Sequence, residues 1–519
     1  MGMKTVNILW ADDEIDLLKP HILFLEEKGC RVLPVISGQD AVAACREEDF
    51  DLIFLDEHMP GLGGLETLLE IKKIHPTVPV VMITKSEEED LMEQAIGKQI
   101  ADYLIKPVHP KQMLMAVKKL VHAQEIISEK TTLDYQSQFL ALSNQTAMAQ
   151  TPSDWQSLYR NLLYWELQLD EANPGMTNML LSQKNEANAC FAKFIKKDYS
   201  GWVFGSDNRP LLSPDIFKTK VFPLLDRGEK VFFVLIDNLR LDQWAMLQRE
   251  LSKTFSFVED ETYYSILPTT TQYSRNAVFA GLMPAQIRQM YPQLWVDEEQ
   301  DEGKNQNEEA LIATQLNRFR KNYKFSYNKI ADNTAGEKYN EKLKSLEANS
   351  LNIVVFNFVD MLSHARTEVK LFRDLAPDEA AYRSLVLSWF KHGCIAEFFR
   401  QLSEMHFTVV LTTDHGSVRV KNPVKVSGDK HTNSNLRYKL GKNLGYDKKD
   451  FFVVDRPADH GLPSPNLSTC YLFATGDDFI AYPNNYNYYV SYYRDTFQHG
   501  GVSMEEMIIP VATFKPKRP

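Results

Sequence analysis

The chain lacks any apolar run long enough to cross a bilayer, because its longest runs, such as Val231–Ile236 and Ile353–Val359, only reach the length of a strand. Cysteine is scarce: the five residues are scattered and form no CxxC pair, which predicts reduced thiols in a cytoplasmic protein. The sequence starts directly with a strand pattern, so we expect no signal peptide. No helix crowded with arginine and lysine follows residue 120, which disfavours a DNA-binding output.

Acidic residues are unevenly distributed. The formal net charge is −11, but residues 1–120 hold 13 Lys and Arg against 21 Asp and Glu, whereas the remaining residues hold 45 against 48. The acidity therefore belongs to an N-terminal domain, and a broad nucleic-acid-binding surface is not expected. With 519 residues, of which 44% are hydrophobic, the chain is long enough for about two to four globular domains. We place them at 1–122, 123–204 and 205–519.

Residues 1–122 alternate short apolar runs with helical patterns. The predicted strands are Thr5–Trp10, Arg31–Ile36, Asp51–Leu55, Pro79–Ile83 and Asp102–Ile105. The predicted helices are Glu14–Lys28, Gly38–Arg46, Leu65–Ile74, Glu88–Ile100 and Pro110–Ala123. Five such units predict a doubly wound (βα)5 α/β domain with a parallel sheet, and ligands bind such sheets at the carboxyl ends of the strands.

Polar residues lie at those predicted carboxyl ends. Asp12 and Asp13 follow the first strand, and Asp56 ends the third. Three carboxylates at one edge repel each other unless a divalent cation joins them, and oxygen ligands favour Mg²⁺. Thr84 and Lys106 end the fourth and fifth strands and are suited to bind phosphoryl oxygens. One such acid alone would be an ordinary loop residue, but five positions in register predict a site.

With these motifs the segment resembles the receiver domains of response regulators. The resemblance implies that Asp56 accepts a phosphoryl group from a sensor histidine kinase. It implies that Mg²⁺ is bound by Asp12, Asp13, Asp56 and the backbone carbonyl of His58. Thr84, Lys106 and the switch residue Tyr103 would respond to the phosphate and alter the face formed by the last helices. That face often dimerises in this family, so we expect a homodimer on phosphorylation.

Residues 110–200 are rich in helix formers and contain few strand signals. The helices expected around this region are Pro110–Glu129, Asp134–Ala149, Ser153–Asp170 and Met176–Lys197. Trp155, Leu158, Leu162 and Trp165 recur at helical spacing, which we interpret as a core-facing stripe rather than a groove for a ligand or partner. We expect a helical bundle that relays the state of the first domain, with a boundary at 201–214.

Three apolar runs in residues 205–519 each end in an aspartate, namely Val231–Asp237, Ile353–Asp360 and Phe407–Asp414. Their apolarity predicts a mostly parallel sheet with the three aspartates at its ligand edge. His364 follows Asp360 by one helical turn, His415 follows Asp414 directly, and His499 precedes another apolar run. Each pattern alone is weak, but three histidines and three aspartates suit zinc and suffice for two ions.

A run of threonines offers a nucleophile. Pro268-Thr-Thr-Thr271 ends an irregular stretch and precedes a helical pattern over Tyr273–Gly281. A hydroxyl at the start of a helix is stabilised by the helix dipole, and coordination to a metal would lower its pKa. Such a run is usually a strand or a helix cap when it stands alone, and Thr269 and Thr270 adjoin Thr271.

The order of these motifs resembles the PglZ domain of the alkaline-phosphatase superfamily, and the segments concerned are VLIDNLR, LPTTTQYSRNAVFAGLMP, FNFVDMLSHAR, VLTTDHGS and HGGVSMEEMIIPV. The resemblance implies an alkaline-phosphatase-like α/β fold and a zinc-dependent phosphohydrolase in which Thr271 attacks phosphorus. One zinc ion would be bound by Asp360, His364 and His499. The second would be bound by Asp237, Thr271, Asp414 and His415.

A receiver, a helical bundle and a PglZ domain in this order resemble the PorX-type response regulators. This resemblance implies a regulator of type IX secretion that works with a sensor histidine kinase, a sigma factor and secretion motor proteins. We expect a phosphodiesterase for a small phosphodiester or oligonucleotide, although no residue decides between diester, monoester and sulfate ester. The alternative is a non-enzymatic signalling adaptor whose zinc-bearing domain binds a partner.

Three polar segments are interpreted as exposed surface or loops. Asp297–Glu309 and Lys338–Ser350 are expected to be solvated surface, with a substrate lid as the alternative for both. Ser427–His431 is expected to be a plain loop, although its lysine and histidine could contact a substrate phosphate.

Overall fold

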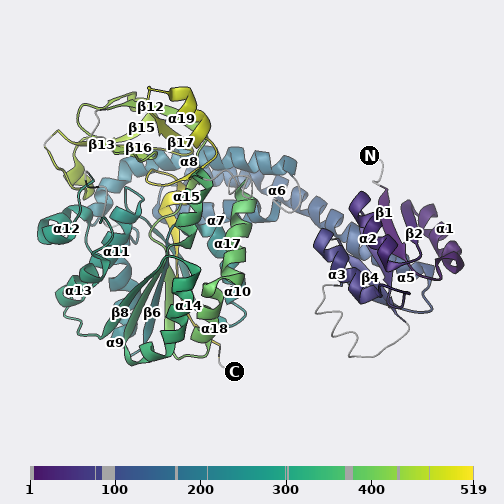
Figure 1. Cartoon of the computed structure of the whole chain (residues 1–519). Helices are drawn as coiled ribbons and strands as arrows, with labels where there is room; N and C mark the ends of the chain where they lie inside the picture. The colour runs from purple at the N-terminus through teal and green to yellow at the C-terminus, as the bar shows by residue number, and fades with distance from the viewer. Residues whose placement is uncertain are drawn as a thin grey trace. The chain divides into compact units, whose positions relative to one another are not determined.

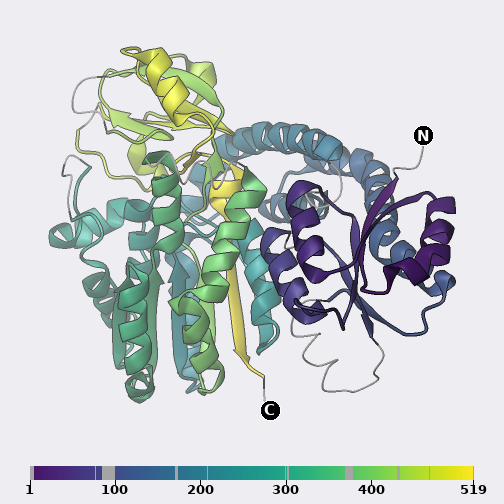
Figure 2. The ribbon, with the colours of Figure 1, turned by 45° about the vertical axis from the view of Figure 1, so that its right-hand side comes forward.

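The structure is a computed structural model that describes residues 5–75, 78–84, 100–169, 174–206, 208–298, 300, 303–368, 378–428, 433–466 and 468–517, without the side chains of residues 122–130, 174–175 and 365–368. The chain divides into two compact units, residues 1–136 with 171–174 and residues 137–170 with 175–519. Figures 1 and 2 show the ribbon of both units in two orientations.

The first unit is built on a parallel five-stranded sheet with the order β2-β1-β3-β4-β5. Its strands are β1 (Val6–Ala11), β2 (Cys30–Val35), β3 (Leu52–Asp56), β4 (Val80–Thr84) and β5 (Asp102–Ile105). Its helical segments are η1 (Ile15–Leu18), α1 (Lys19–Glu27), α2 (Gly38–Glu47), α3 (Gly64–Ile74) and α5 (Pro110–Val117). The predicted helix at Glu88–Ile100 lies outside the described residues except for its last residue. The predicted doubly wound sheet is confirmed.

Successive residues of each strand point to opposite faces of this sheet, and helices cover both faces. On one face, Trp10 and Phe54 pack with residues of α1 and α5. On the other face, Leu9 and Ile53 pack with residues of α2 and α3. With both faces covered by helices, the carboxyl edge of the strands remains for polar residues.

Helix α5 continues through the π-turn η2 (Lys118–His122) directly into α6 (Ala123–Met148). The predicted break between residues 129 and 134 was therefore wrong. The intervening residues include no glycine or proline, and the two threonines there lower helix propensity only slightly. The boundary between the two units falls within α6, after Gln136.

Helices α7 (Pro152–Leu169) and α8 (Pro174–Val203) belong to the second unit, apart from the first residue of α8. The side chains of Trp155, Leu158 and Leu162 are buried, as expected for a core-facing stripe. Strand β7 (Phe255–Tyr264) contacts α7 directly: the Gln156 side-chain amide donates to the Thr262 carbonyl at 2.7 Å. The middle helices thus pack against the following domain.

The second unit contains a six-stranded sheet with the order β7-β19-β10-β6-β9-β8. Its remaining strands are β6 (Val231–Ile236), β8 (Phe325–Ile330), β9 (Leu351–Phe356), β10 (Thr408–Thr412) and β19 (Ile508–Pro516). Strands β10, β6, β9 and β8 are parallel, as expected, whereas β19 runs antiparallel to β10 and β7. Every residue of β6, β9 and β10 is buried, so both faces of the central sheet are covered.

The strand predicted to end at Asp360 ends earlier. Strand β9 stops at Phe356 and α15 (Phe358–Glu368) begins two residues later, so Asp360 lies in the first turn of a helix. The placement at a strand end was wrong, because the apolar run continues from the strand into the helix. Asp360 and His364 consequently lie on one face of α15.

A separate lobe is inserted between β10 and β19 and lies at the top of the second unit in Figure 1. Three residues after His415 the chain enters β11 (Val418–Arg419), which pairs with β18 (Phe497–Gln498) just before His499. Between them lie β12 (Asn422–Ser427), β13 (Tyr438–Gly441), β14 (Gly445–Tyr446), η8 (Lys448–Asp450), β15 (Phe451–Val454), η9 (Pro457–His460), β16 (Cys470–Ala474), β17 (Asp478–Ala481) and α19 (Tyr486–Tyr493).

Helical segments fill the remainder of the second unit. They are η3 (Ser213–Asp215), η4 (Phe217–Val221), α9 (Phe222–Asp226), α10 (Leu241–Leu251), η5 (Thr271–Arg275), α11 (Asn276–Ala280), α12 (Pro284–Met290), η6 (Pro292–Leu294), α13 (Glu308–Arg318), α14 (Asn333–Lys342), η7 (Leu343–Ala348), α17 (Glu379–His392), α18 (Cys394–Ser403) and α20 (Met504–Met507). The segment Lys338–Ser350 spans the end of α14 and η7 and is not wholly surface, because Tyr339 and Leu343 are buried. Within the described residues, no helix is both long and apolar enough to span a membrane.

Candidate functional site

The carboxyl edge of the first sheet brings together three acids and a lysine. Oxygen atoms of Asp12, Asp13 and Asp56 lie within 4.8 Å of one another. The Lys106 ammonium at the end of β5 lies 3.0 Å from Asp12 Oδ2 and 2.9 Å from Asp56 Oδ1. Asp12 and Asp56 are buried, whereas Asp13 is exposed. Parallel strands thus place these side chains at one point, as the sequence predicts.

The charges in this pocket do not balance. Burial raises the pKa of Asp56; Lys106 opposes this shift, and Asp12 and Asp13 add to it. Burial lowers the pKa of Lys106, but its hydrogen bonds to Asp56 and Asp12 outweigh burial and raise it. Three carboxylates and one ammonium leave a net negative charge, which suits a divalent cation with oxygen ligands.

The other predicted receiver residues lie around this pocket. The Thr84 hydroxyl donates to the carboxylate of Glu57, a residue that the sequence reasoning did not single out. The side chain of His58 is exposed and lies 3.6 Å from the same carboxylate. Tyr103 on β5 is 40% exposed.

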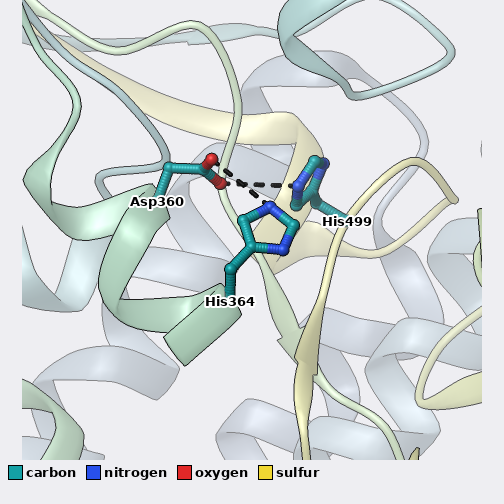
Figure 3. Close-up of side chains that lie close together, drawn as sticks. All are labelled: Asp360, His364 and His499. Atoms are coloured by element: carbon teal, nitrogen blue, oxygen red, sulfur yellow. Dashed lines mark ion pairs between the residues drawn. The ribbon is translucent and has the colours of Figure 1, made fainter. Parts of the chain in front are cut away.

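In the second unit, Asp360, His364 and His499 form a first cluster (Figure 3). Both aspartate oxygens face a histidine: Oδ2 lies 3.4 Å from His364 Nε2, and Oδ1 lies 3.5 Å from His499 Nε2. Asp360 and His364 come from α15, and His499 comes from the segment that leaves the inserted lobe. Residues 135 positions apart in the sequence therefore share one site.

Asp237, Asp414 and His415 form a second, fully buried cluster at the ends of β6 and β10. His415 Nε2 lies 3.7 Å from Asp237 Oδ1 and 3.8 Å from Asp414 Oδ2. The rings of His415 and His499 stack with centroids 4.2 Å apart, so the two clusters are adjacent.

Asn238 joins the two clusters. Its backbone N–H donates to Asp414 Oδ1 at 3.4 Å, and its side-chain amide donates to Asp360 Oδ1 at 3.2 Å. Its φ of 61° lies in the left-handed region, which asparagine tolerates better than most residues. The sequence offers no local signal for this role.

The histidines present lone pairs to the carboxylates. With Nδ1 as the donor, His499 donates to the Thr269 carbonyl at 3.3 Å and His415 donates to the Gly416 carbonyl at 3.1 Å. Each Nε2 then faces carboxylate oxygens without a proton between them, an arrangement that a cation would stabilise. Burial, with a contribution from His415, lowers the pKa of His499 to about 3, so its imidazole is neutral near pH 7.

The carboxylates of this region also need positive charge. Burial raises the pKa of Asp237 well above its usual range, and Asp414 and Asp360 add to the shift while Arg275 opposes it. Burial likewise raises the pKa of Asp414. Three aspartates, neutral imidazoles and one arginine leave a net negative charge, so the residues fit two divalent cations with mixed nitrogen and oxygen ligands.

The structure distinguishes among the three threonines. The Thr271 hydroxyl lies 3.2 Å from His415 Nε2 and 3.4 Å from Asp237 Oδ1. The Thr269 hydroxyl instead donates to the Gly501 carbonyl and accepts from the Gly500 N–H, each at 3.0 Å. The buried Thr270 hydroxyl has no hydrogen-bond partner among the described residues. Thr271 is thus the threonine whose hydroxyl adjoins the second cluster.

A buried arginine was missed by the sequence reasoning. Arg275 follows Thr271 by one helical turn, and its guanidinium lies 3.0 Å from Asp237 Oδ2, 3.4 Å from Asp414 Oδ2 and 3.1 Å from Glu308 Oε1. The spacing of four residues from the threonine was visible in the sequence, but nothing local assigned the arginine a partner.

The segment Asp297–Glu309 was expected to be solvated surface, but part of it is buried. Glu308 is 1% exposed and pairs with Arg275, and the Asn305 side chain donates to the Thr271 carbonyl at 3.0 Å. Glu308 can be buried because it meets a charged partner, whereas Asn305 is half-buried and Glu309 is exposed. Most of the predicted loop Ser427–His431, including its lysine and histidine, lies outside the described residues.

Three family models match the chain. Residues 8–118 match the response regulator receiver domain, and residues 125–203 match the PorX response regulator linker domain. Residues 216–514, more than half of the chain, match the BREX system PglZ alkaline phosphatase-like domain.

Curated relatives match shorter parts of the chain. The transcriptional regulatory protein ZraR of Escherichia coli K12 is 30% identical over 148 residues, 28% of this chain and 34% of that protein. ResD of Bacillus subtilis is 32% identical over 115 residues, 22% of this chain and 48% of that protein. The chain thus spans about a third of the length of ZraR.

Similar solved structures include the receiver domain of NtrX from Brucella abortus, with 31% identity, a TM-score of 0.21, and coverage of 22% of this chain and 98% of that one. CheY4 of Vibrio cholerae has 22% identity, a TM-score of 0.22, and coverage of 22% of this chain and 99% of that one.

Proposed function

Because this chain belongs to the PglZ alkaline phosphatase-like family and joins that domain to a receiver and a PorX linker domain, we propose that it is a phosphorylation-controlled, zinc-dependent phosphodiesterase. The observation that carries this proposal is the position of the Thr271 hydroxyl, 3.2 Å from His415 Nε2 and beside two adjacent clusters of aspartate and histidine. A nucleophile next to a dinuclear metal site is the arrangement that phosphoryl transfer requires.

In this proposal one zinc ion is bound by Asp360, His364 and His499, and the second by Asp237, Thr271, Asp414 and His415. Bound zinc would lower the pKa of the Thr271 hydroxyl and neutralise charge on the phosphoryl oxygens. Thr271 Oγ attacks phosphorus, the ester oxygen leaves, and water then releases the phosphoryl group from threonine. The carbonyls of Thr269 and Gly416 orient the two imidazoles through their Nδ1 hydrogen bonds.

Replacement of the nucleophile tests the enzymatic proposal. We expect Thr271→Val to lower kcat for bis(4-nitrophenyl) phosphate by roughly 1,000-fold or more, because no other hydroxyl replaces it. Thr270→Val is the matched control, since the Thr270 hydroxyl contacts no described polar group. Zinc content is measured on the same samples. Two zinc ions per wild-type chain without turnover of any phosphodiester, monoester or sulfate ester would favour the non-enzymatic adaptor instead.

We further propose that Asp56 is the phosphorylated residue, with Mg²⁺ bound by Asp12, Asp13, Asp56 and the His58 carbonyl. The Lys106 ammonium, 2.9 Å from Asp56, would neutralise the incoming phosphoryl group, and Thr84 and Tyr103 would respond to it. We expect Asp56→Ala to abolish labelling by acetyl phosphate, whereas the exposed Asp49→Ala retains it. Labelling that persists in Asp56→Ala would assign the phosphate to another carboxylate.

The proposed partners follow from the family and from the resemblance above. The receiver domain implies a phosphodonor such as a histidine kinase. We propose that the phosphorylated chain forms a homodimer and acts in the cytoplasm on a small nucleotide phosphodiester or oligonucleotide. A sigma factor and the type IX secretion motor proteins are the proposed protein partners, supported by the match of residues 125–203 to the PorX linker domain.

A further inference from the structure

Helix α8 carries a buried stripe that runs along most of its length. Its members recur every three or four residues and are Lys184, Asn188, Phe191, Ile195, Tyr199 and Trp202. Three of them are polar, although each is less than a tenth exposed. A buried polar side chain destabilises a fold unless it is hydrogen-bonded, so the partners of these three residues show what the helix binds.

The C-terminal half of α8 binds the segment that leads to the nucleophile. The Tyr199 hydroxyl accepts a hydrogen bond from the Leu267 N–H at 2.8 Å, four residues before Thr271. The ring of Trp202 meets the ring of Tyr264 edge to face, with centroids 5.1 Å apart. Tyr264 ends β7, so both ends of the segment 264–267 are fixed by α8.

The N-terminal half of α8 binds the segment that follows His499. Asn188 Oδ1 accepts from the Met504 N–H at 2.8 Å, and Asn188 Nδ2 donates to Glu505 Oε2 at 2.9 Å. The Lys184 ammonium lies 3.2 Å from Glu505 Oε1 and 2.8 Å from Glu166 on α7. Helix α20, which contains Met504 and Glu505, also contacts Gly416, the residue after His415.

That last contact is a close backbone approach. A Cβ atom on Gly416 would lie 2.1 Å from the Glu505 carbonyl oxygen, so only glycine fits there. The Gly416 N–H donates to the Glu506 carbonyl at 3.1 Å. Through α20, the N-terminal half of α8 therefore supports the segments that carry His415 and His499.

We propose that α8 is a positioning element of the active site, which fixes the segment that carries Thr271 relative to the segments that carry His415 and His499. This inference rests on the proposed function. Tyr199 and Asn188 are positioning residues on one rigid helix, so a rotation or shift of α8 displaces both sides of the site together. The linker domain is then a part of the catalytic unit and the element through which that unit can be regulated.

Single-group substitutions test each side of the site. Tyr199→Phe removes one hydroxyl and keeps the ring, and we expect kcat for bis(4-nitrophenyl) phosphate to fall about tenfold, with KM within about twofold and two zinc ions retained. Asn188→Ala releases the Met504 N–H and Glu505, and we expect one of the two zinc ions to pass to a chelator about tenfold faster. Tyr339→Phe on α14 is the matched control, because its buried hydroxyl has no partner among the described residues.

The zinc-release measurement needs no turnover. If the wild type hydrolyses no phosphodiester, the proposed function fails, while the comparison of Asn188→Ala with the control still tests the positioning role. Should Asn188→Ala fail to fold, Lys184→Arg and Lys184→Met give the same test. We then expect the slow zinc release of the wild type only for the arginine variant. A kcat and a zinc-release rate that match those of Tyr339→Phe in every α8 variant would overturn the inference.

Discussion

At the scale of single residues, the charge of Arg275 is the feature on which the second cluster depends. Its guanidinium binds Asp237 Oδ2 at 3.0 Å, while Asp237 Oδ1 faces Thr271 and His415. The arginine thus binds Oδ2 of this carboxylate and leaves Oδ1 for the proposed zinc ion. Its removal would leave the buried carboxylates of Asp237 and Asp414 without the arginine as counter-charge, whereas Glu308 would keep its ion pair with Lys329 at 2.8 Å.

We therefore predict that Arg275→Met lowers the zinc content from two ions to one per chain, because the second cluster loses its orientation while Asp360, His364 and His499 are unchanged. Zinc is measured by native mass spectrometry of the folded protein. Arg318→Met is the control, since the Arg318 guanidinium donates to the carbonyls of Ala280 and Gly281, away from both clusters. Two retained zinc ions in Arg275→Met would contradict this role.

At the scale of an element, strand β13 of the inserted lobe carries a buried lysine whose ammonium donates to a backbone carbonyl. Lys439 Nζ donates to the Asn433 carbonyl at 2.6 Å and lies 4.6 Å from the Tyr482 ring centroid. Burial lowers the pKa of Lys439 to about 7, whereas ion pairs with Glu166 and Glu505 raise that of Lys184 despite burial. A lowered pKa means that the folded state disfavours the charged amine.

This gives a pH prediction. The pKa of Lys439 falls from its ordinary value of 10.5 to about 7 in the folded state. With respect to this group the protein is therefore most stable above pH 10.5, and its free energy of unfolding falls by about 1.4 kcal/mol for each pH unit as the pH drops from 10.5 toward about 7. The Lys439→Met variant has no titratable group here, so it does not lose stability in this way as the pH falls. We expect its gain in melting temperature over the wild type to be larger at about pH 7 than at about pH 10. The control is Lys425→Met, whose exposed ammonium also lies 4.6 Å from a tyrosine ring. Equal gains at both pH values would contradict the burial argument.

At the scale of the whole molecule, the chain forms two compact units, and helices α7 and α8 belong with the alkaline phosphatase-like domain apart from the first residue of α8. The buried pairs Lys184–Glu505 and Arg383–Glu166 connect these helices to the domain. Unfolding of the two units should therefore be separable, with the linker helices unfolding together with the second unit.

We predict two calorimetric transitions with different metal responses. A ligand that binds only the folded state stabilises it by about 2.7 kcal/mol at 100 times its Kd. Zinc should therefore raise the transition temperature of the second unit only, and Mg²⁺ that of the first unit only. Chelation should reverse the zinc effect, and Asp56→Ala should weaken the Mg²⁺ effect. A single transition that responds to both metals would contradict the division into two units.

The sequence by itself determined the features that depend on local pattern. Apolar strands followed by acids predicted that Asp12, Asp56 and Lys106 share one edge, because the ends of parallel strands meet there. The same reasoning brought Asp237 and Asp414 together, and helical spacing paired Asp360 with His364. These residues need only correct secondary structure and a parallel sheet to converge.

Tertiary structure alone decided the contacts between distant segments. Three adjacent threonines are alike in sequence, and only packing placed the Thr271 hydroxyl beside His415. The same holds for the pairing of Arg275 with Glu308 and of Asn188 with Glu505, which are 317 residues apart. Such pairs depend on how helices and strands pack against each other, and no short pattern encodes that packing.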